Sequence, residues 1–307
     1  MSPRTELVED LLTLAWAQWT ALGVNGLKPA RGSALDLEAL MLLTAELADN
    51  DPRLFGEAVD WCSRHYRYVS KPRLKQLLSS SAPTTAESFG GFASALETHA
   101  GGSWPNANVR PPLQLHLSGK SRAPDPEQPS LLNLRLRSLF GVGARADVIT
   151  ALLGWPSPAF TASDLVFVGY TKRNLSDTLD SLRAAGLLSS KRVGNRVLFS
   201  WRRFRELSAL VAPLPSSIPR WPTMVRVLSS FLALLASTEG KSERLSLVAA
   251  ATVLREIAPD LDVLGLTPPL VTLGETSWSE VAAWLLQSSR RLTQASHSPS
   301  NATQGPL

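Results

Sequence analysis

The strongest constraint on the fold comes from residues 161–201, where helix caps and glycines follow one another at short intervals. Thr161 stands three residues before Asp164, the spacing of a capping box with Asp in place of the usual Glu or Gln. This pair predicts a helix of barely two turns that stops at Gly169. Thr171 or its neighbour then caps a second helix, so the two helices are joined by a tight turn.

A supporting helix and a hairpin are predicted on either side of these two helices. Before them, residues 144–153 repeat large apolar side chains at helical spacing. After them, Gly186 is placed to close the second helix in a left-handed conformation. Two strand-like runs, 187–192 and 196–201, then flank the turn signal at 193–195. The predicted order is three helices followed by a two-stranded ribbon.

The second capped helix has an apolar side and a polar side. Its apolar side is expected to pack on the preceding helices and carries Leu175, Thr178, Leu179 and Leu182. Its opposite side faces solvent and carries Arg173, Ser176, Asp177 and Asp180, flanked by Lys172. Trp201, the last residue of the second strand-like run, is expected to pack the hairpin onto the helices.

Positive charge is concentrated in this part of the chain. Residues 134–203 contain 11 Lys and Arg against 4 Asp and Glu, a net charge of +7, whereas the whole chain carries +5. The flanking segments 1–99 and 204–307 have net charges of −3 and 0. Because duplex DNA presents about one negative charge per ~1.7 Å of its axis, a localised basic segment favours phosphate binding.

The stretch TASDLVFVGYTKRNLSDTLDSLRAAGLLSSKRVGNRVLFSW resembles the helix-turn-helix and wing of bacterial winged-helix regulators of the MarR and ArsR kind, over about residues 134–203. The resemblance implies that the helix over 172–185 enters the major groove and that the wing over 187–201 lies on the DNA backbone. It implies base contacts from Lys172, Arg173, Ser176 and Asp177. It implies phosphate contacts from Lys191, Arg192 and Arg196, with Asn195 between them as a further DNA-binding residue. We therefore predict a sequence-specific transcriptional regulator that binds double-stranded DNA.

Two departures from this family leave alternatives open. Asp177 and Asp180 would repel phosphate, although they can pair with arginines along the helix and Asp177 can accept from a cytosine amino group. The cysteine pairs of ArsR-type metal sensors are absent, since Cys62 is the only cysteine. One alternative is an antitoxin-like or protein-interaction module, because winged helices with helical partners also occur in antitoxins of abortive-infection nucleotidyltransferase systems. The other is an enzyme whose site joins residues that the sequence does not connect.

The predicted fold class is mainly α, with a central winged helix-turn-helix and its β-hairpin flanked by N-terminal and C-terminal helical domains. Helix caps such as Asp51-Pro52 and apolar periodicity predict the flanking helices, including 221–237, 243–257 and 278–292. The predicted division is an N-terminal helical bundle (1–99), a Pro/Gly-rich linker (100–133), the winged helix-turn-helix (134–203), a C-terminal helical domain (204–294) and a disordered tail (295–307).

Three short patterns are typical of enzymes or metal sites, but each has a simpler interpretation. Residues 141–146 match the dinucleotide-binding spacing G-x-G-x-x-A, and the preceding NLRLRSLF has the composition of a possible strand, yet no second strand-helix-strand unit follows. Residues 240–242 imitate the end of a phosphate-binding loop, but they follow a helical pattern. Cys62 and His65 are two ligands at most and are expected to be packed side chains. We predict no catalytic site, no cofactor and no metal.

Two further expectations concern the environment of the protein. The start of the chain lacks a basic region followed by an apolar stretch, and no run of 18 apolar residues occurs, which predicts a cytoplasmic protein without membrane contact. The C-terminal helices carry apolar residues on more than one face, among them Phe231, Leu232, Leu234, Leu235, Leu245, Leu247, Val248 and Val253. Such a surplus predicts either a homodimer through these helices or a core closed against the N-terminal region.

Overall fold

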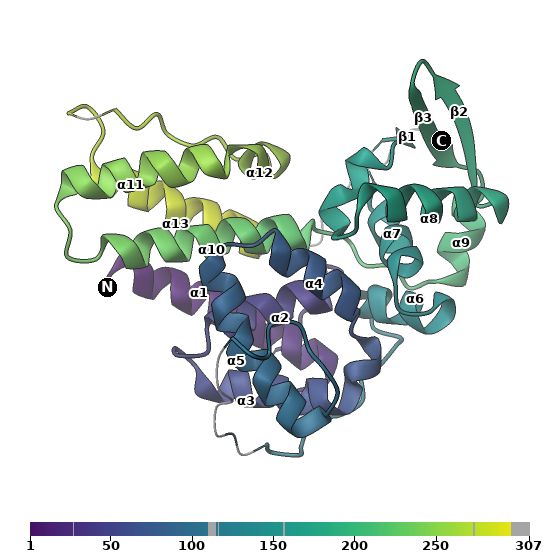
Figure 1. Ribbon diagram of the computed structural model, residues 1–307, viewed down its shortest axis with the longest axis horizontal. Coiled ribbons are helices and arrows are strands. Elements are labelled where there is room, and N and C mark those ends of the chain that lie inside the picture. Colours follow the sequence, from purple (N-terminus) through teal and green to yellow (C-terminus); the bar gives the residue numbers. More distant parts are fainter. Residues whose placement is uncertain (27, 110–114, 116, 156, 273, 296–307) are drawn as a thin grey trace.

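The computed structural model describes residues 1–26, 28–109, 115, 117–155, 157–272 and 274–295, and the chain is mainly helical with one small antiparallel sheet (Figure 1). The N-terminal helices are α1 (Pro3–Leu22), α2 (Leu37–Glu46), α3 (Pro52–His65), α4 (Lys71–Ser79) and α5 (Pro83–Ala100), with the 3-10 turns η1 (Tyr66–Tyr68) and η2 (Pro129–Leu131) after α3 and α5. The central elements are α6 (Leu132–Phe140), α7 (Ala144–Leu153), β1 (Ala159–Phe160), η3 (Ser163–Val168), α8 (Lys172–Ala184), β2 (Leu188–Val193), β3 (Arg196–Trp201) and α9 (Phe204–Leu210). The C-terminal helices are α10 (Trp221–Thr238), α11 (Glu243–Glu256), α12 (Ala258–Val263) and α13 (Trp278–Ala295). The prediction of a mainly helical chain is confirmed.

The N-terminal and C-terminal helices share one hydrophobic core. Helix α1 packs against α10 and α13, and α10 also packs against α2 (Figure 1). Trp19 and Phe55 are buried in the same cluster as Phe231 and Leu285. The sequence-based division placed these helices in separate domains, whereas the structure joins them because each set covers the apolar faces of the other. We call α1–α5 with α10–α13 the helical body.

Much of the segment predicted as a linker is packed onto the helical body. Trp104 is only 3% exposed and belongs to the core of the body. The backbone N–H of Arg122 donates to the carbonyl of Gly23 at 2.9 Å, and that of Gly119 donates to the Asp60 carboxylate at 3.2 Å. The backbone of this proline-rich segment thus finds acceptors on the body, which lets it pack without regular structure. Residues 110–114 and 116 lie outside the described residues.

The central elements form a unit with a core of its own, which we call the central unit (α6–α9, η3 and β1–β3). Helix α6 joins the two cores, because Leu134 packs into the helical body while Leu132 and Leu136 pack into the central unit. The possible strand NLRLRSLF is therefore a helix. The unit also extends beyond the predicted end at residue 203, since α9 contributes Leu207 and the next buried residue, Val211, follows it.

The turn before α8 contains half of the predicted capping box, because the Asp164 side chain reaches back to Thr161 but no side chain caps the start of η3. The backbone N–H and the hydroxyl of Thr161 donate to the Asp164 carboxylate at 2.7 and 2.8 Å. The following turns close with i to i+3 hydrogen bonds, so the predicted short helix is the 3-10 helix η3. Gly169 ends it with φ +93°. Thr171 then caps the start of α8, because its hydroxyl accepts from the N–H of Asn174 at 3.3 Å.

The sheet has the strand order β1-β3-β2 and packs on the helices of the central unit. The short strand β1 pairs with the inner end of β3 and was not predicted. Trp201 donates from its indole nitrogen to the Leu152 carbonyl at 3.3 Å, and its ring packs edge-on against Phe204. The prediction that this tryptophan packs the hairpin onto the helices is confirmed. Figure 1 shows the hairpin projecting beyond the helices on the side away from the helical body.

Candidate nucleic-acid interface

Helix α8 buries one face and leaves the other to solvent. Three leucines at helical spacing are buried in the core of the central unit: Leu175, Leu179 and Leu182. Lys172, Arg173 and Asp177 are exposed, whereas Ser176 is half-buried at the edge of the exposed face. The polar side chains predicted to contact bases thus lie on the side of α8 opposite to its core, apart from the partial burial of Ser176.

The cations of the hairpin divide between its two faces. Side chains alternate along each strand, so the register places Arg192 on the same face as Leu188 and Phe199, which packs on the helices. Lys191 and Arg196 lie on the opposite face. All four predicted DNA-binding residues of the hairpin are exposed, namely Lys191, Arg192, Asn195 and Arg196.

These cations are not neutralised by nearby carboxylates. Within the described part of the chain, no ion pair involves Lys172, Arg173, Lys191, Arg192 or Arg196. The acidic residues of α8 behave differently from one another. Asp180 pairs with Arg183 at 3.2 Å, as the spacing predicted, whereas Asp177 is exposed and forms no ion pair with Arg173. The exposed face of α8 therefore carries one uncompensated negative charge beside its positive charges.

The sequence-based prediction did not include one arginine that lies beside the exposed face of α8. Arg145 is exposed at the start of α7, and its guanidinium group donates to the hydroxyl of Ser181 on α8 at 3.3 Å. It was counted in the +7 charge of the segment, but only the packing of α7 against α8 brings it to the helix.

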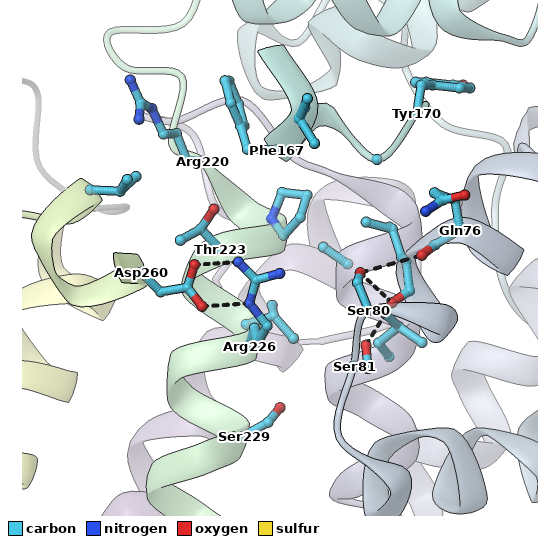
Figure 2. Close-up of a pocket in the computed structure, with 18 of the residues that line it drawn as sticks. Gln76, Ser80, Ser81, Phe167, Tyr170, Arg220, Thr223, Arg226, Ser229 and Asp260 are labelled. Carbon is cyan, nitrogen blue, oxygen red and sulfur yellow. Dashed lines mark hydrogen bonds and ion pairs between the residues drawn. The ribbon is translucent and has the colours of Figure 1, made fainter. Parts of the chain in front are cut away.

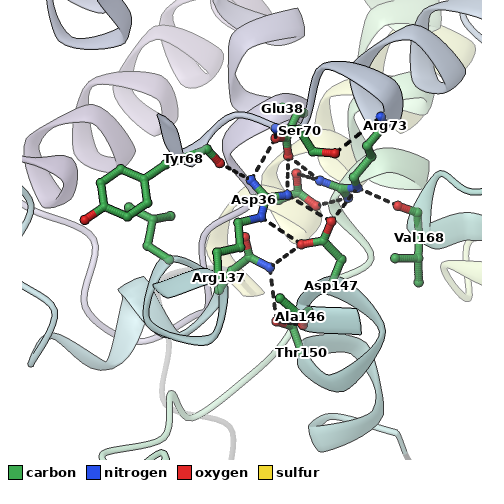
Figure 3. A network of polar contacts seen from close by, with 12 residues as sticks. Asp36, Glu38, Tyr68, Ser70, Arg73, Arg137, Ala146, Asp147, Thr150 and Val168 are labelled. Atoms are coloured by element: carbon green, nitrogen blue, oxygen red, sulfur yellow. Dashed lines mark hydrogen bonds and ion pairs between the residues drawn. The ribbon is translucent and has the colours of Figure 1, made fainter. Parts of the chain in front are cut away.

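A buried network of charges connects the central unit to the helical body (Figure 3). Arg73 of α4 donates to Asp36 and Glu38 through its terminal nitrogens, at 2.5 to 2.8 Å, and its Nε donates to the Val168 carbonyl at 2.6 Å. Val168 is the last residue of η3. A residue of the helical body thus holds the end of the helix that precedes α8.

Arg137 of α6 forms the second half of the network. Its guanidinium group donates to both carboxylate oxygens of Glu38 at 2.7 and 2.8 Å and to Asp147 at 2.9 and 3.0 Å. Burial raises the pKa of the Asp147 carboxyl, but the charges of Arg137 and Arg73 outweigh burial and hold that pKa at about 2. Two arginines therefore share three carboxylates, those of Asp36, Glu38 and Asp147.

Tyr170 carries this network to the start of α8. Its hydroxyl donates to Asp147 at 2.6 Å and lies 3.2 Å from the hydroxyl of Ser70. Burial raises the pKa of Tyr170, and the negative charge of Asp147 raises it further, so the phenol keeps its proton and donates. Thr171, the N-cap of α8, is the next residue. No sequence pattern indicated this network, because its members come from four separate segments of the chain.

The short patterns typical of other chemistry fall in ordinary structural settings. Residues 141–143 connect helix α6 to helix α7 rather than a strand to a helix, and residues 240–242 connect α10 to α11. Cys62 is fully buried, and the ring of His65 packs on Trp61 with the ring centroids 4.8 Å apart. No group of three potential metal ligands occurs among the described residues.

The comparisons with known proteins add no relative. Neither family models, nor curated proteins, nor solved structures give a significant match to this chain. The likeness to MarR-like and ArsR-like regulators therefore rests on the residues quoted above. Among the helices that the structure describes, none is long and apolar enough to span a bilayer.

Proposed function

We propose that residues 134–203 are a winged helix-turn-helix that binds duplex DNA, and that the protein is a transcriptional regulator. Under this proposal α7, η3 and α8 are the three helices, and β2 and β3 are the wing. The observation that carries the proposal is the set of five exposed and unpaired cations on α8 and the hairpin: Lys172, Arg173, Lys191, Arg192 and Arg196. Exposed cations without partners are free to replace the counterions of DNA phosphates.

The two elements have different roles in this proposal. Helix α8 has the width that a major groove admits, and Arg173 is placed to donate to guanine while Asp177 can accept from a cytosine amino group. The hairpin contacts the backbone through Lys191 and Arg196 on one face and Arg192 on the other. Arg145 is a further candidate for a phosphate contact, because it lies beside α8.

A salt titration tests the proposal. The intact protein is titrated onto labelled genomic fragments, and the logarithm of the association constant is plotted against that of the salt concentration. Five displaced counterions predict a slope of about −4 to −5. Reversing two charges with Lys191→Glu and Arg196→Glu is expected to weaken binding to all sequences, whereas the control Arg244→Glu, on an exposed position of α11, is expected to leave it unchanged. Affinity that does not depend on salt contradicts the proposal.

Asp177 and two exposed valines favour a second candidate, an antitoxin-like or protein-interaction module. Val193 and Val197 of the hairpin are 50% and 40% exposed, and Asp177 adds a negative charge to the face of α8. Apolar and acidic groups of this kind suit a protein partner better than a phosphate backbone. If Asp177→Asn strengthens binding to all DNA sequences alike, the carboxylate does not read a base, and the second candidate gains support.

A further inference from the structure

A cavity of about 560 Å³ lies where the central unit meets the helical body (Figure 2). The central unit contributes one wall with Phe167 and Tyr170, and the body contributes Leu77 of α4 and Val225 of α10. Pockets for small organic ligands have volumes of about 300–1,000 Å³ and are lined mainly by apolar groups with a few polar ones. This cavity has the size of such a pocket, its lining combines apolar side chains with a larger share of polar ones, and both units bound it.

Arg226 supplies a fixed hydrogen-bond donor inside the cavity. Its Nε donates to the Asp260 carboxylate at 2.6 Å, and its Nη2 donates to the other carboxylate oxygen. Figure 2 shows the guanidinium group between Asp260 and Ser80. Among the described residues, none accepts a hydrogen bond from the third nitrogen, Nη1. The ion pair thus holds the arginine in place and leaves one edge for a ligand oxygen.

Arg220 supplies a second cation at the rim. Its guanidinium carbon lies 4.9 Å from the ring centroid of Phe167 and 5.2 Å from that of Trp155. These contacts use the flat face of the group and leave the N–H donors at its edge. No carboxylate of the described chain forms an ion pair with Arg220. In contrast, the acidic groups of the lining are engaged, since Asp260 pairs with Arg226 and Asp164 accepts from Thr161.

We propose that this cavity binds a small organic acid. The carboxylate pairs with the edge of Arg220, a second oxygen acceptor of the ligand bonds to Nη1 of Arg226, and the apolar or aromatic part of the ligand lies against Phe167 and Leu77. An acid fits better than an amine because the donors of the cavity are open and its carboxylates are occupied.

The position of the cavity connects ligand binding to α8. Gly169 lies in its wall, and a Cβ atom at this position would come within 2.7 Å of Leu77 Cδ2, so η3 and α4 are in close contact. Tyr170 and the N-cap of α8 follow directly. A ligand that touches both walls favours one arrangement of η3 on α4. The change in DNA affinity is at most the ratio of the ligand's affinities for the two arrangements. This regulatory part rests on the proposed DNA binding, whereas ligand binding does not.

Calorimetry on the intact protein without DNA tests the site. The probes are 4-acetylbenzoate, 4-ethylbenzoate, which lacks the second acceptor, and 4-acetylbenzamide, which lacks the charge. We expect 4-acetylbenzoate to bind most tightly and Arg220→Gln to weaken it about tenfold or more. Arg226→Lys keeps a cation for Asp260 but removes Nη1, so it is expected to weaken 4-acetylbenzoate and leave 4-ethylbenzoate unchanged.

The exposed Arg244→Gln is the matched control, and circular dichroism verifies that each variant is folded. If Arg220→Gln does not fold, Arg226→Lys and the three probes still decide between the outcomes. The site is overturned if none of the acids binds, or if the amide binds as well as the acid.

The coupling is tested separately by measuring DNA affinity with and without 4-acetylbenzoate. We expect a change of about 5-fold to 150-fold, and the same factor in acid affinity when DNA is added, because coupling is reciprocal. An unchanged DNA affinity with a bound acid overturns the coupling but not the site. A protein that binds the acid and no DNA overturns the proposed function and the coupling together.

Discussion

At the scale of single residues, the proposed roles of α8 and the hairpin predict different losses from two arginines. Arg173→Ala is expected to weaken binding to the preferred DNA sequence by about 1–3 kcal/mol and to relax base preference, because its donors can reach a guanine edge. Arg192→Ala is expected to weaken all sequences alike, because a phosphate contact carries no sequence information. Binding measured across a library of duplexes separates the two effects. Equal losses that ignore sequence would show that α8 does not read bases.

Asp147 gives a residue-scale prediction for acid stability. Its pKa in the folded protein is about 2, below the ordinary value of 3.8. The ionised carboxylate therefore stabilises the fold above about pH 4, and this contribution, on the order of 2 kcal/mol, is lost as the pH falls from about 4 to 2. Urea unfolding of the wild type at a series of pH values between about 2 and 6 measures this contribution to the free energy of unfolding.

A pair of variants assigns that pH dependence. Asp147→Asn is expected to remove this part of it and to lower stability at neutral pH by about 3–5 kcal/mol, because Arg137 and Arg73 lose a buried partner. Asp180→Asn removes an exposed carboxylate instead and is expected to leave the acid profile as in the wild type. If Asp147→Asn and the wild type lose stability in parallel between these pH values, the carboxylate is not the cause.

At the scale of elements, the contact between η3 and α4 predicts unequal costs for two glycine substitutions. Gly169 and Gly186 both have left-handed backbones, with φ +93° and +76°. A side chain at Gly186 would meet open space, so Gly186→Ala is expected to cost about 1–2 kcal/mol for the conformation alone. Gly169→Ala adds an overlap with Leu77 and is expected to cost about 1–3 kcal/mol more. Denaturant unfolding compares the two variants.

A double-mutant cycle identifies the source of the extra cost. In the background of Leu77→Ala, the colliding methyl group is absent, and the costs of Gly169→Ala and Gly186→Ala are expected to become similar. Additive effects of Gly169→Ala and Leu77→Ala would mean that η3 and α4 do not press on each other at this point.

At the scale of the whole molecule, most of the apolar side chains of the C-terminal helices are buried within a single chain. Phe231, Leu234 and Leu247 lie in the core shared with the N-terminal helices, while Leu245 and Val248 of α11 are 57% and 48% exposed. Closure of a common core was one of the two outcomes expected from the sequence. The proposed homodimer now rests on the exposed face of α11.

Sedimentation of the intact protein tests this dimer. We expect a dimer for the wild type and a monomer with weaker DNA binding for Leu245→Ser combined with Val248→Ser, because paired half-sites need two modules. The control Leu270→Ser changes an 86% exposed leucine in a loop and should leave the mass unchanged. A wild-type protein that sediments as a monomer and still binds its site tightly contradicts the dimer.

The sequence by itself determined the local structure of this protein. Caps such as Asp51 and Thr171, turn glycines such as Gly169, and apolar periodicity placed most helices and the hairpin, because these signals act within a few residues of the chain. The same local reasoning found the exposed cations of α8, since their neighbours in the helix repeat were buried leucines.

Only the tertiary structure decided how these elements are grouped. The apolar face of a helix does not specify which other face it will contact. The sequence therefore left the shared core of α1 and α10 as one of two possible outcomes, and it did not predict the packing of residues near Trp104. The buried network around Arg137 and the cavity at Arg226 join segments that are distant in sequence, and no spacing rule relates them. Long-range contacts of this kind are selected by the free energy of the whole packed chain, which no single segment contains.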